Sequence, residues 1–400
     1  MGLERAGFSI AGCVEIDPDC RETLQTNRPD WRLAEPADIH SVRATDVLST
    51  FGVARGEAVL LAGGPPCQPF SKSAQWHGDS ARRMHDPRAR TLSAYFRVLE
   101  ATLPQAMLLE NVKGITATRK RVTQRYEGFD VLRSSLARIN RRQGTSYEPQ
   151  LLVIDAADQG VPQHRERVFV FAARDGSALA GPGATYGPVA RAANGRAAVE
   201  RYTTAWDAIG HFDDPDFDPN LRARGVWADL LPSIPEGCNY LHHTPRGAGE
   251  PLFGWRTRYW SFLLKLAKAR PSWTIQAQAG PATGPFHWRS RRLAVRELAA
   301  LQCFPSEWCF AGGPTSARRQ VGNAVPPPVG EALGLQIRRD TLGQRPSPRV
   351  PLVPAIRDDC PPPEALSPVP VKFLERRAEH ADHPGTGRGP SPRHQAIQGV

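Results

Sequence analysis

The sequence predicts an α/β protein that has a doubly wound, Rossmann-like sheet and a second, smaller domain of irregular structure. Over residues 1–173, short apolar runs typical of buried strands alternate with segments whose apolar positions recur at helical spacing. From about residue 174 to 290 this alternation stops, and Gly, Pro, Trp and Arg become frequent without a clear period. We therefore expect a sheet-based first domain, followed by a loop-rich segment that we call the variable region (174–290).

The apolar runs and periodic segments predict five strands and four helices. The strands are expected at Ser9–Ile16, Ala58–Ala62, Ala106–Leu109, Leu151–Ile154 and Val168–Ala172. The helices are expected at Thr91–Thr102, Val131–Arg141, Leu293–Gln302 and Val325–Arg338. Residues 291–340 are expected to support the variable region and to return the chain to the first domain. The tail, residues 341–400, is rich in proline and lacks sustained apolar periodicity, which predicts disorder.

The composition limits the partners and the compartment. A net charge of +11 favours an acidic partner such as nucleic acid, although an Arg-rich composition would give the same charge without any such partner. Seven cysteines form an odd number with no CxxC pair, which argues against a disulfide framework and against a zinc site. No apolar run reaches membrane-spanning length and no signal peptide opens the chain, so we expect a cytoplasmic protein without a membrane partner or a metal.

Residues 63–71, Gly-Gly-Pro-Pro-Cys-Gln-Pro-Phe-Ser, follow the expected strand Ala58–Ala62 directly. Two glycines and two prolines end the strand abruptly and stiffen the loop that carries Cys67. Open α/β sheets bind their ligands at the carboxyl ends of their strands. A cysteine thiol held at such a strand end is well placed to act as a nucleophile. An isolated cysteine would more often be a buried, inert thiol.

Three further motifs follow in chain order: Leu-Leu-Glu-Asn-Val at 108–112, Gln-His-Arg-Glu-Arg at 163–167, and Gln-Val-Gly-Asn-Ala-Val-Pro at 320–326. With the Cys67 loop, these motifs resemble those of the DNA (cytosine-5) methyltransferase family, and the resemblance runs from residue 3 to about 338. It implies transfer of a methyl group from S-adenosyl-L-methionine to C5 of cytosine in double-stranded DNA, within a restriction–modification system or alone.

Cytosine C5 is a poor nucleophile, so its methylation needs a thiolate that adds to C6, a proton donor at N3 and a cation near O2. The resemblance assigns these roles to Cys67, Glu110 and Arg165. Apolar neighbours favour the neutral form of Glu110, which suits proton donation. The alternatives are an ion-paired or helix-capping glutamate at 110 and a solvated charge run at 163–167.

The target base is inaccessible inside a duplex, so the resemblance also implies base flipping. The segment Ser71–Arg90 is small, polar and Arg-rich, as a moving DNA-contacting loop would be. In the variable region, the aromatic and basic clusters at 255–260 and 284–289 are candidates for DNA contacts, or else for the core of the smaller domain. The residues expected to bind DNA are Gln68, Ser71, Arg82, Arg83, Arg167, Arg256 and Arg258.

The expected cofactor contacts are dispersed along the chain. Glu15 would hydrogen-bond the ribose hydroxyls, Ile16 would pack on the adenine, and Asp38 with Ile39 resembles the family's adenine-contacting pair. Thr91 or Leu92 occupies the next position at which family members contact the cofactor, and the match to the family motif is ambiguous by one residue. Asn323 should return to the same pocket. An acidic residue at the end of a strand is otherwise ordinary solvated surface.

The family's opening strand and its Phe-x-Gly-x-Gly-Gly turn have no counterpart, because Met1–Phe8 resembles the helix that follows that turn. We expect the true start to lie upstream. The alternative is a truncated, catalytically inactive DNA-binding homologue. A tRNA cytosine-5 methyltransferase is a further alternative, against which the long variable region argues. We expect a monomer that shares its target site with any cognate restriction endonuclease, without direct contact.

Overall fold

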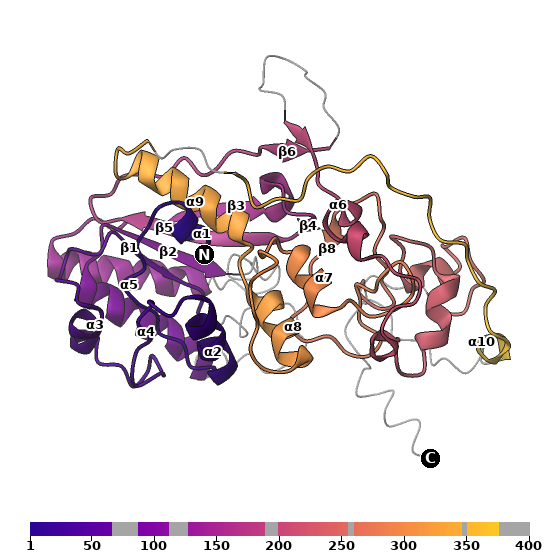
Figure 1. The fold of residues 1–400 in the computed structure, drawn as a ribbon. Helices are drawn as coiled ribbons and strands as arrows, with labels where there is room; N and C mark the ends of the chain where they lie inside the picture. Colours follow the sequence, from indigo (N-terminus) through magenta and orange to yellow (C-terminus); the bar gives the residue numbers. More distant parts are fainter. Residues whose placement is uncertain (66–86, 112–126, 189–198, 255–259, 346–349, 376–400) are drawn as a thin grey trace.

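The computed structural model describes residues 1–65, 87–111, 127–188, 199–254, 260–345 and 350–375 (Figure 1). Its centre is a four-stranded sheet in the order β1-β2-β5-β3. The strands are β1 (Leu60–Gly63), β2 (Ala106–Asn111), β3 (Gln150–Asp155) and β5 (Glu166–Ala173). β1 runs parallel to β2, and β5 is antiparallel to both β2 and β3. The carboxyl ends of β1 and β2 therefore meet at one edge of the sheet.

Helices cover both faces of this sheet, which explains why its central strands are apolar on both sides. Met107 and Leu109 face α4 (Pro87–Thr102) and α5 (Glu127–Gln143). Ala106 and Leu108 face the opposite way and pack with α9 (Pro327–Asp340). Figure 1 shows α4 and α5 on one side of the sheet and α9 on the other. The α/β class and the doubly wound, Rossmann-like sheet predicted from the sequence are confirmed.

The first residues of the chain lie against this late helix. α1 (Gly2–Arg5) packs on α9, and a Cβ atom at Gly2 would lie 2.5 Å from the Pro327 carbonyl oxygen. Only glycine permits the two backbones to approach this closely. Two further helices complete the layer near β1, namely α2 (Pro18–Asn27) and α3 (Ala44–Phe51), which contacts α4.

The strand predicted at Ser9–Ile16 does not form. Cys13 makes an isolated bridge to Leu33, and no other residue of the segment joins a strand. The chain then enters α2, where the Asp17 carboxylate accepts a hydrogen bond from the Cys20 backbone N–H at 3.1 Å. Apolar Val14 packs instead against the cluster around Val42. A strand needs a partner along its whole length, and this segment has one at a single residue.

Between β5 and α7 (Val295–Ala300) the described residues form only short elements. These are β6 (Tyr186–Gly187), β7 (Glu200–Arg201), α6 (Ala205–Ile209), η6 (Gly210–Phe212), η7 (Pro219–Leu221), η8 (Ala228–Ser233), η9 (Tyr240–His243) and β8 (Ser272–Trp273). Of the 284–289 cluster, Phe286, His287 and Trp288 are buried. That cluster therefore belongs to the core rather than to an exposed surface. None of the described helices is long and apolar enough to cross a bilayer.

Residues 350–375, which we call the C-terminal strap, pack along the variable region, contrary to the predicted disorder of the tail. Figure 1 shows the strap crossing from beside α9 to α10 (Val371–Glu375) at the far side of the molecule. Glu364 Oε1 lies 2.9 Å from the buried Lys268 ammonium, and Asp359 accepts a hydrogen bond from the Trp206 indole. Proline prevents regular structure here, yet a few anchoring side chains still hold the segment.

Substituting Phe373 with alanine is expected to destabilise the protein by roughly 3 kcal/mol, the usual cost of emptying a buried phenylalanine site. The ring is 2% exposed and stacks on Trp227 with centroids 5.6 Å apart. Denaturant unfolding of the full-length chain measures the change. The neighbouring Leu374→Ala substitution is the control because its side chain is exposed. Equal loss of stability in the two variants would show that the strap is not anchored by Phe373.

Candidate active site

At the carboxyl end of β1, side chains from neighbouring elements pack so closely against the backbone that glycine fits best there. Gly63 pairs with Leu109, and a Cβ atom added at Gly63 would lie 2.9 Å from the Tyr95 ring. At Gly64 an added Cβ would lie 3.3 Å from Glu110 Oε2. The two glycines therefore let the backbone at residues 63 and 64 lie directly against the Tyr95 ring and the Glu110 carboxyl group. Cys67 follows Gly64 by three residues.

Glu110 is near the end of β2 with its side chain 20% exposed. Burial raises the pKa of its carboxyl group above the ordinary value, and the Arg167 and Arg165 guanidinium groups oppose that rise. Arg167 Nε lies 3.1 Å from Glu110 Oε1. The site thus holds a desolvated carboxyl group beside two cations, and the desolvation dominates.

Arg165 is almost fully buried and donates hydrogen bonds to backbone carbonyls from distant parts of the chain. Its Nη2 atom donates to the Gly322 oxygen at 2.7 Å and to the Ala324 oxygen at 3.0 Å, and its Nη1 atom donates to the Ile275 oxygen at 3.4 Å. Burial lowers the pKa of Arg165 to about 9, which leaves the group charged at neutral pH. Its Nε–H is buried and makes no hydrogen bond to any described residue.

The structure thus brings together Glu110 and Arg165, to which the resemblance assigned catalytic roles, and Arg167. The direct ion pair to Glu110 comes from Arg167, whereas the hydrogen bonds of Arg165 go to carbonyl groups. The direct ion pair between Arg167 and Glu110 was not predicted from the sequence. Its signal was the two-residue spacing of the arginines, which directs both side chains to one face of an extended chain.

Most of the predicted cofactor residues gather beside β1. Val14, which precedes Glu15, packs in one cluster with Ile39 and with Leu61 of β1. Thr91, in α4, lies 3.3 Å from the His40 ring, and the Asp38 carboxylate accepts the His40 backbone N–H at 2.9 Å. The structure therefore brings the segments that hold Glu15, Asp38 and Thr91 to the same side of the sheet.

Two side chains in this region suit an aromatic ring and a hydroxyl-bearing sugar. Ile16 is 62% exposed, which is unusual for an apolar residue that follows a packed segment. One oxygen of Glu15 accepts the Asp17 N–H at 2.8 Å, and its second oxygen makes no hydrogen bond to any described residue. The pair therefore offers an open apolar surface beside a free acceptor, which fits an adenosine.

Asn323 is exposed at the C-terminal end of α8 (Pro314–Asn323), between Gly322 and Ala324, whose carbonyl groups both accept hydrogen bonds from Arg165. Helix α8 is held against the N-terminal segment, since Arg319 Nη1 lies 2.6 Å from Asp17 and Thr23 donates to Gln320 at 2.7 Å. The structure therefore connects the helix of Asn323 to the Glu15 segment and to Arg165 at once. The Arg319–Asp17 ion pair carried no signal in the sequence.

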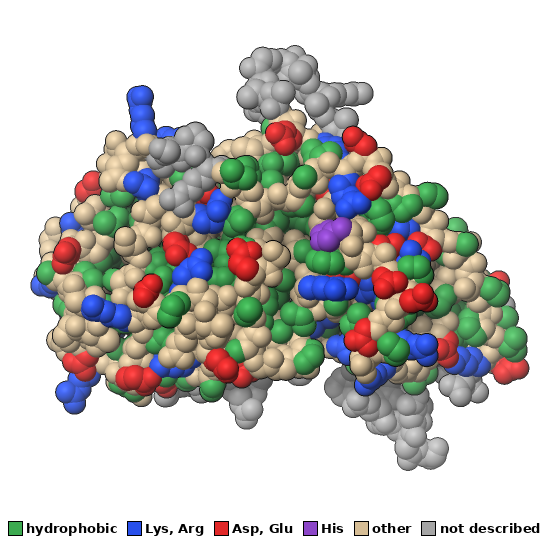
Figure 2. Space-filling model, viewed as in Figure 1, with side chains coloured by type: hydrophobic (Ala, Val, Ile, Leu, Met, Phe, Trp, Pro, Cys, Tyr) green, Lys and Arg blue, Asp and Glu red, His purple; other side chains and the backbone are tan. Residues whose placement is uncertain are grey.

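Seven predicted site residues lie outside the described ranges, so their positions are not tested: Cys67, Gln68, Ser71, Arg82, Arg83, Arg256 and Arg258. Among the residues that are described, no three His, Cys, Asp or Glu side chains come together as a metal site would require. Figure 2 shows one face of the molecule, on which Lys and Arg side chains are interspersed with Asp and Glu. The net charge alone therefore does not mark an interface on that face.

Comparison with known proteins agrees with these motifs. The family described as C-5 cytosine-specific DNA methylase matches residues 1–219 and 236–339. Type II methyltransferase M.SacI of Streptomyces achromogenes is 35% identical over 342 residues, which cover 81% of this chain and 82% of that protein. M1.HphI of Haemophilus parahaemolyticus is 28% identical, covering 83% and 82%. The solved structure of Entamoeba histolytica methyltransferase EhMeth shares the fold, with a TM-score of 0.51, 15% identity and coverage of 85% and 95%.

Proposed function

The chain belongs to the C-5 cytosine-specific DNA methylase family, and on that premise we propose that it methylates C5 of cytosine within a specific duplex DNA sequence, as a type II modification enzyme. The observation that carries the proposal is the group formed by Glu110, Arg165 and Arg167 at the end of β2, beside Gly64. A desolvated acid flanked by two guanidinium groups matches what the cytosine ring requires at N3 and O2.

Cys67 supplies the nucleophile in this proposal. It follows Gly64 by three residues, so the geometry of the chain keeps the two Cα atoms within about 11 Å of each other. Gly64 in turn borders the Glu110 carboxyl group. Addition of the Cys67 thiolate to C6 places electron density on C5, which would then form the bond to the methyl group. Once C5 carries that group, a base removes the C5 proton, the C5–C6 double bond re-forms and the thiolate leaves C6. The ring is therefore activated and restored without a net change at Cys67.

Glu110 holds the proton that N3 takes up while the thiolate adds. Only the protonated carboxyl group can donate, and burial favours that form by raising the pKa. A base that fills the site would exclude further water from the carboxyl group and strengthen the same effect. The nearby Arg167 keeps the carboxyl oriented after the proton has left.

The Nε–H group of Arg165 is available as a hydrogen-bond donor to the substrate. Its Nη atoms are engaged with the carbonyls of Gly322, Ala324 and Ile275, which fix the guanidinium plane. A buried donor without a partner costs about 1–3 kcal/mol. The Nε–H group is such a donor among the described residues, and the O2 atom of a flipped cytosine is an acceptor that would satisfy it.

S-adenosyl-L-methionine supplies an electrophilic methyl group when bound. The residues that would hold it are Glu15, Ile16, Asp38, Ile39, Thr91 and Asn323. The exposed Ile16 side chain and the free oxygen of Glu15 support this placement, because they offer an apolar surface and an acceptor on neighbouring residues. Double-stranded DNA would contact the segment 71–90 and the variable region, with the target base flipped into the site.

A duplex that carries 5-fluorocytosine is expected to trap the enzyme as a stable covalent adduct through Cys67 when S-adenosyl-L-methionine is present. Fluorine at C5 leaves no proton to remove, so the thiolate cannot depart. Denaturing electrophoresis detects the adduct and peptide mapping locates it. The same duplex with ordinary cytosine should leave no stable adduct.

The location of the adduct decides between the alternatives. Attachment through exposed Cys309 or Cys360 would refute the assignment of Cys67. A 5-fluorocytosine-substituted tRNA tested in parallel distinguishes the RNA substrate, because trapping by tRNA alone would overturn the proposed DNA specificity.

A further inference from the structure

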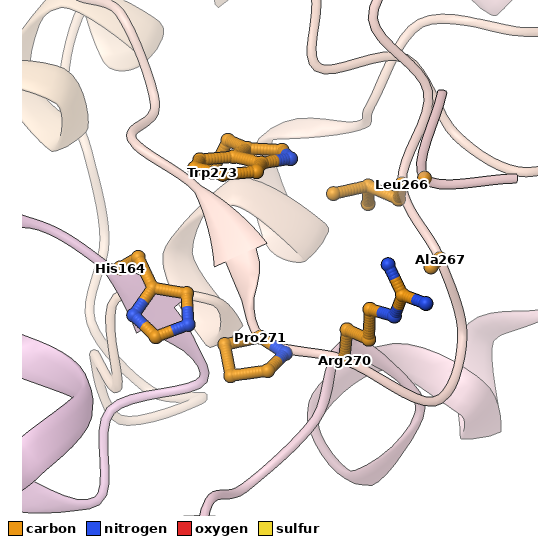
Figure 3. Close-up of a pocket in the computed structure, with 7 residues that line it drawn as sticks. His164, Leu266, Ala267, Arg270, Pro271 and Trp273 are labelled. Carbon is orange, nitrogen blue, oxygen red and sulfur yellow. The ribbon is translucent and has the colours of Figure 1, made fainter. Parts of the chain in front are cut away.

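A cavity of about 190 Å³ lies where the strand that precedes Arg165 meets the variable region. β4 (Gln163–His164) pairs there with β8, and His164 is in register with Trp273. Figure 3 shows the side chains arranged around an open centre. The cavity is lined by His164, Gly237, Leu266, Ala267, Arg270, Pro271 and Trp273.

The aromatic part of the cavity is open to solvent. Trp273 is 39% exposed, and the neighbouring Trp260 is 47% exposed with its ring centroid 5.4 Å away in an edge-on arrangement. Large aromatic side chains are normally buried, as Trp288 is in this same region. Two adjacent exposed indoles therefore point to a surface that is covered by a ligand.

The polar part of the cavity is cationic. Figure 3 shows the Arg270 guanidinium turned toward the open centre, and it has neither an ion pair nor a hydrogen-bond partner among the described residues. His164 Nδ1 lies 2.9 Å from Asp155, and this hydrogen bond raises the pKa of the imidazole. Asp155 is engaged with His164, and the carboxylate of the nearby Asp158 accepts a hydrogen bond from the Tyr202 hydroxyl group. Among the residues that the structure describes, no acidic side chain lines the cavity itself.

The size of the cavity restricts the ligand. Pockets that enclose a complete small molecule measure about 300–1,000 Å³, so a cavity of about 190 Å³ suits one unit of an extended ligand. An exposed indole next to an unpaired guanidinium is the combination that binds nucleic acid, by contact with a base or sugar and with a phosphate. The cavity also adjoins the proposed active site, because His164 directly precedes Arg165.

We propose that this cavity binds one nucleotide of the DNA duplex outside the target cytosine, with its phosphate at Arg270 and His164 and its sugar or base against Trp273. The inference rests on the proposed function and extends it by a contact that holds the duplex at the junction of the sheet domain and the variable region. One residue of this contact, His164 of β4, directly precedes Arg165, the arginine proposed to bind cytosine O2.

The test measures duplex binding as a function of salt concentration for the full chain, with S-adenosyl-L-methionine present. Arg270→Ala is expected to weaken binding about 3- to 10-fold near 0.1 M salt and to lower the slope of log affinity against log salt by about 1, since one phosphate contact is lost. Trp273→Ala should weaken binding by a few fold and leave the slope unchanged, because it removes no charge.

Arg138→Ala is the matched control, because Arg138 is an exposed arginine on α5 and its loss changes the net charge equally. It should leave the slope unchanged.

If Arg270→Ala behaves like Arg138→Ala while the unmodified protein binds and methylates DNA, the cavity is not a DNA site and the proposed function stands. Failure of the unmodified protein to bind duplex DNA would overturn both. Binding of free dCMP that depends on Arg270 and is unaffected by duplex DNA would assign the cavity to a free nucleotide and overturn the proposal.

Discussion

Replacing Cys67 with serine is expected to lower the rate of methyl transfer by on the order of 10⁴-fold or more, because a serine hydroxyl remains protonated at neutral pH and adds poorly to C6. Affinity for duplex DNA and for S-adenosyl-L-methionine should change by no more than about threefold, since the substitution replaces one atom and leaves the ion pair of Glu110 with Arg167 in place. The measurement is transfer of labelled methyl to mixed-sequence DNA, with binding measured separately.

Cys309→Ser supplies the matched control, because Cys309 is an exposed cysteine far along the chain from the proposed site. It should retain full activity. A Cys67→Ser protein that keeps more than a few per cent of the activity would rule out the thiolate route. An unmodified protein that binds DNA but transfers no methyl group would instead favour the non-catalytic DNA-binding homologue.

The sequence predicted the sheet well, for a physical reason. β1, β2, β3 and β5 are marked by short apolar runs, and β2 and β5 carry apolar side chains on both faces because helices cover the sheet on both sides. The segment Ser9–Ile16 shows the limit of that signal. Its pattern is strand-like, but a strand also requires a neighbour, and local residues do not report whether one is present.

The candidate site likewise has residues that local sequence marks and contacts that it does not reveal. Motifs marked Glu110 and Arg165 as candidates because each occupies a distinctive string next to an apolar run. The carbonyl groups that hold Arg165 belong to Ile275, Gly322 and Ala324, all more than 100 residues away in sequence. Such contacts depend on how the end of α8 and the segment after β8 are placed around Arg165, which no local pattern encodes.

The C-terminal strap was mispredicted because composition averages over a segment. Its prolines indicated disorder, whereas its position depends on a few anchors such as Phe373 and Glu364. The 284–289 cluster shows the converse, because basic and aromatic residues suggested an interface, yet His287 and Trp288 are fully buried. In both cases the burial of single side chains decides the outcome, and composition does not contain that information.

Replacing Glu110 with glutamine is expected to lower kcat by about 10²- to 10⁴-fold while the KM for DNA changes little, because glutamine keeps the shape and polarity of the side chain but cannot supply an acidic proton to N3. The pH dependence provides a second readout. Because the protonated carboxyl is the active form and burial raises its pKa, the rate of the unmodified enzyme should fall as pH rises through that raised pKa. The Glu110→Gln enzyme should lack this fall.

Stability separates this catalytic role from a structural one. A carboxyl group whose pKa is raised by folding stabilises the native state most below its unfolded pKa and loses that contribution as pH rises through the folded value. Glu110→Gln should therefore leave the protein at least as stable as before at pH 8, even though it breaks the ion pair with Arg167. Glu100→Gln, which removes a glutamate that pairs with Arg142 outside the site, is the control and should retain activity. Comparable activity losses in the two variants, or a Glu110→Gln enzyme that has lost both activity and stability, would identify Glu110 as a structural ion-paired residue and leave the N3 proton without a donor.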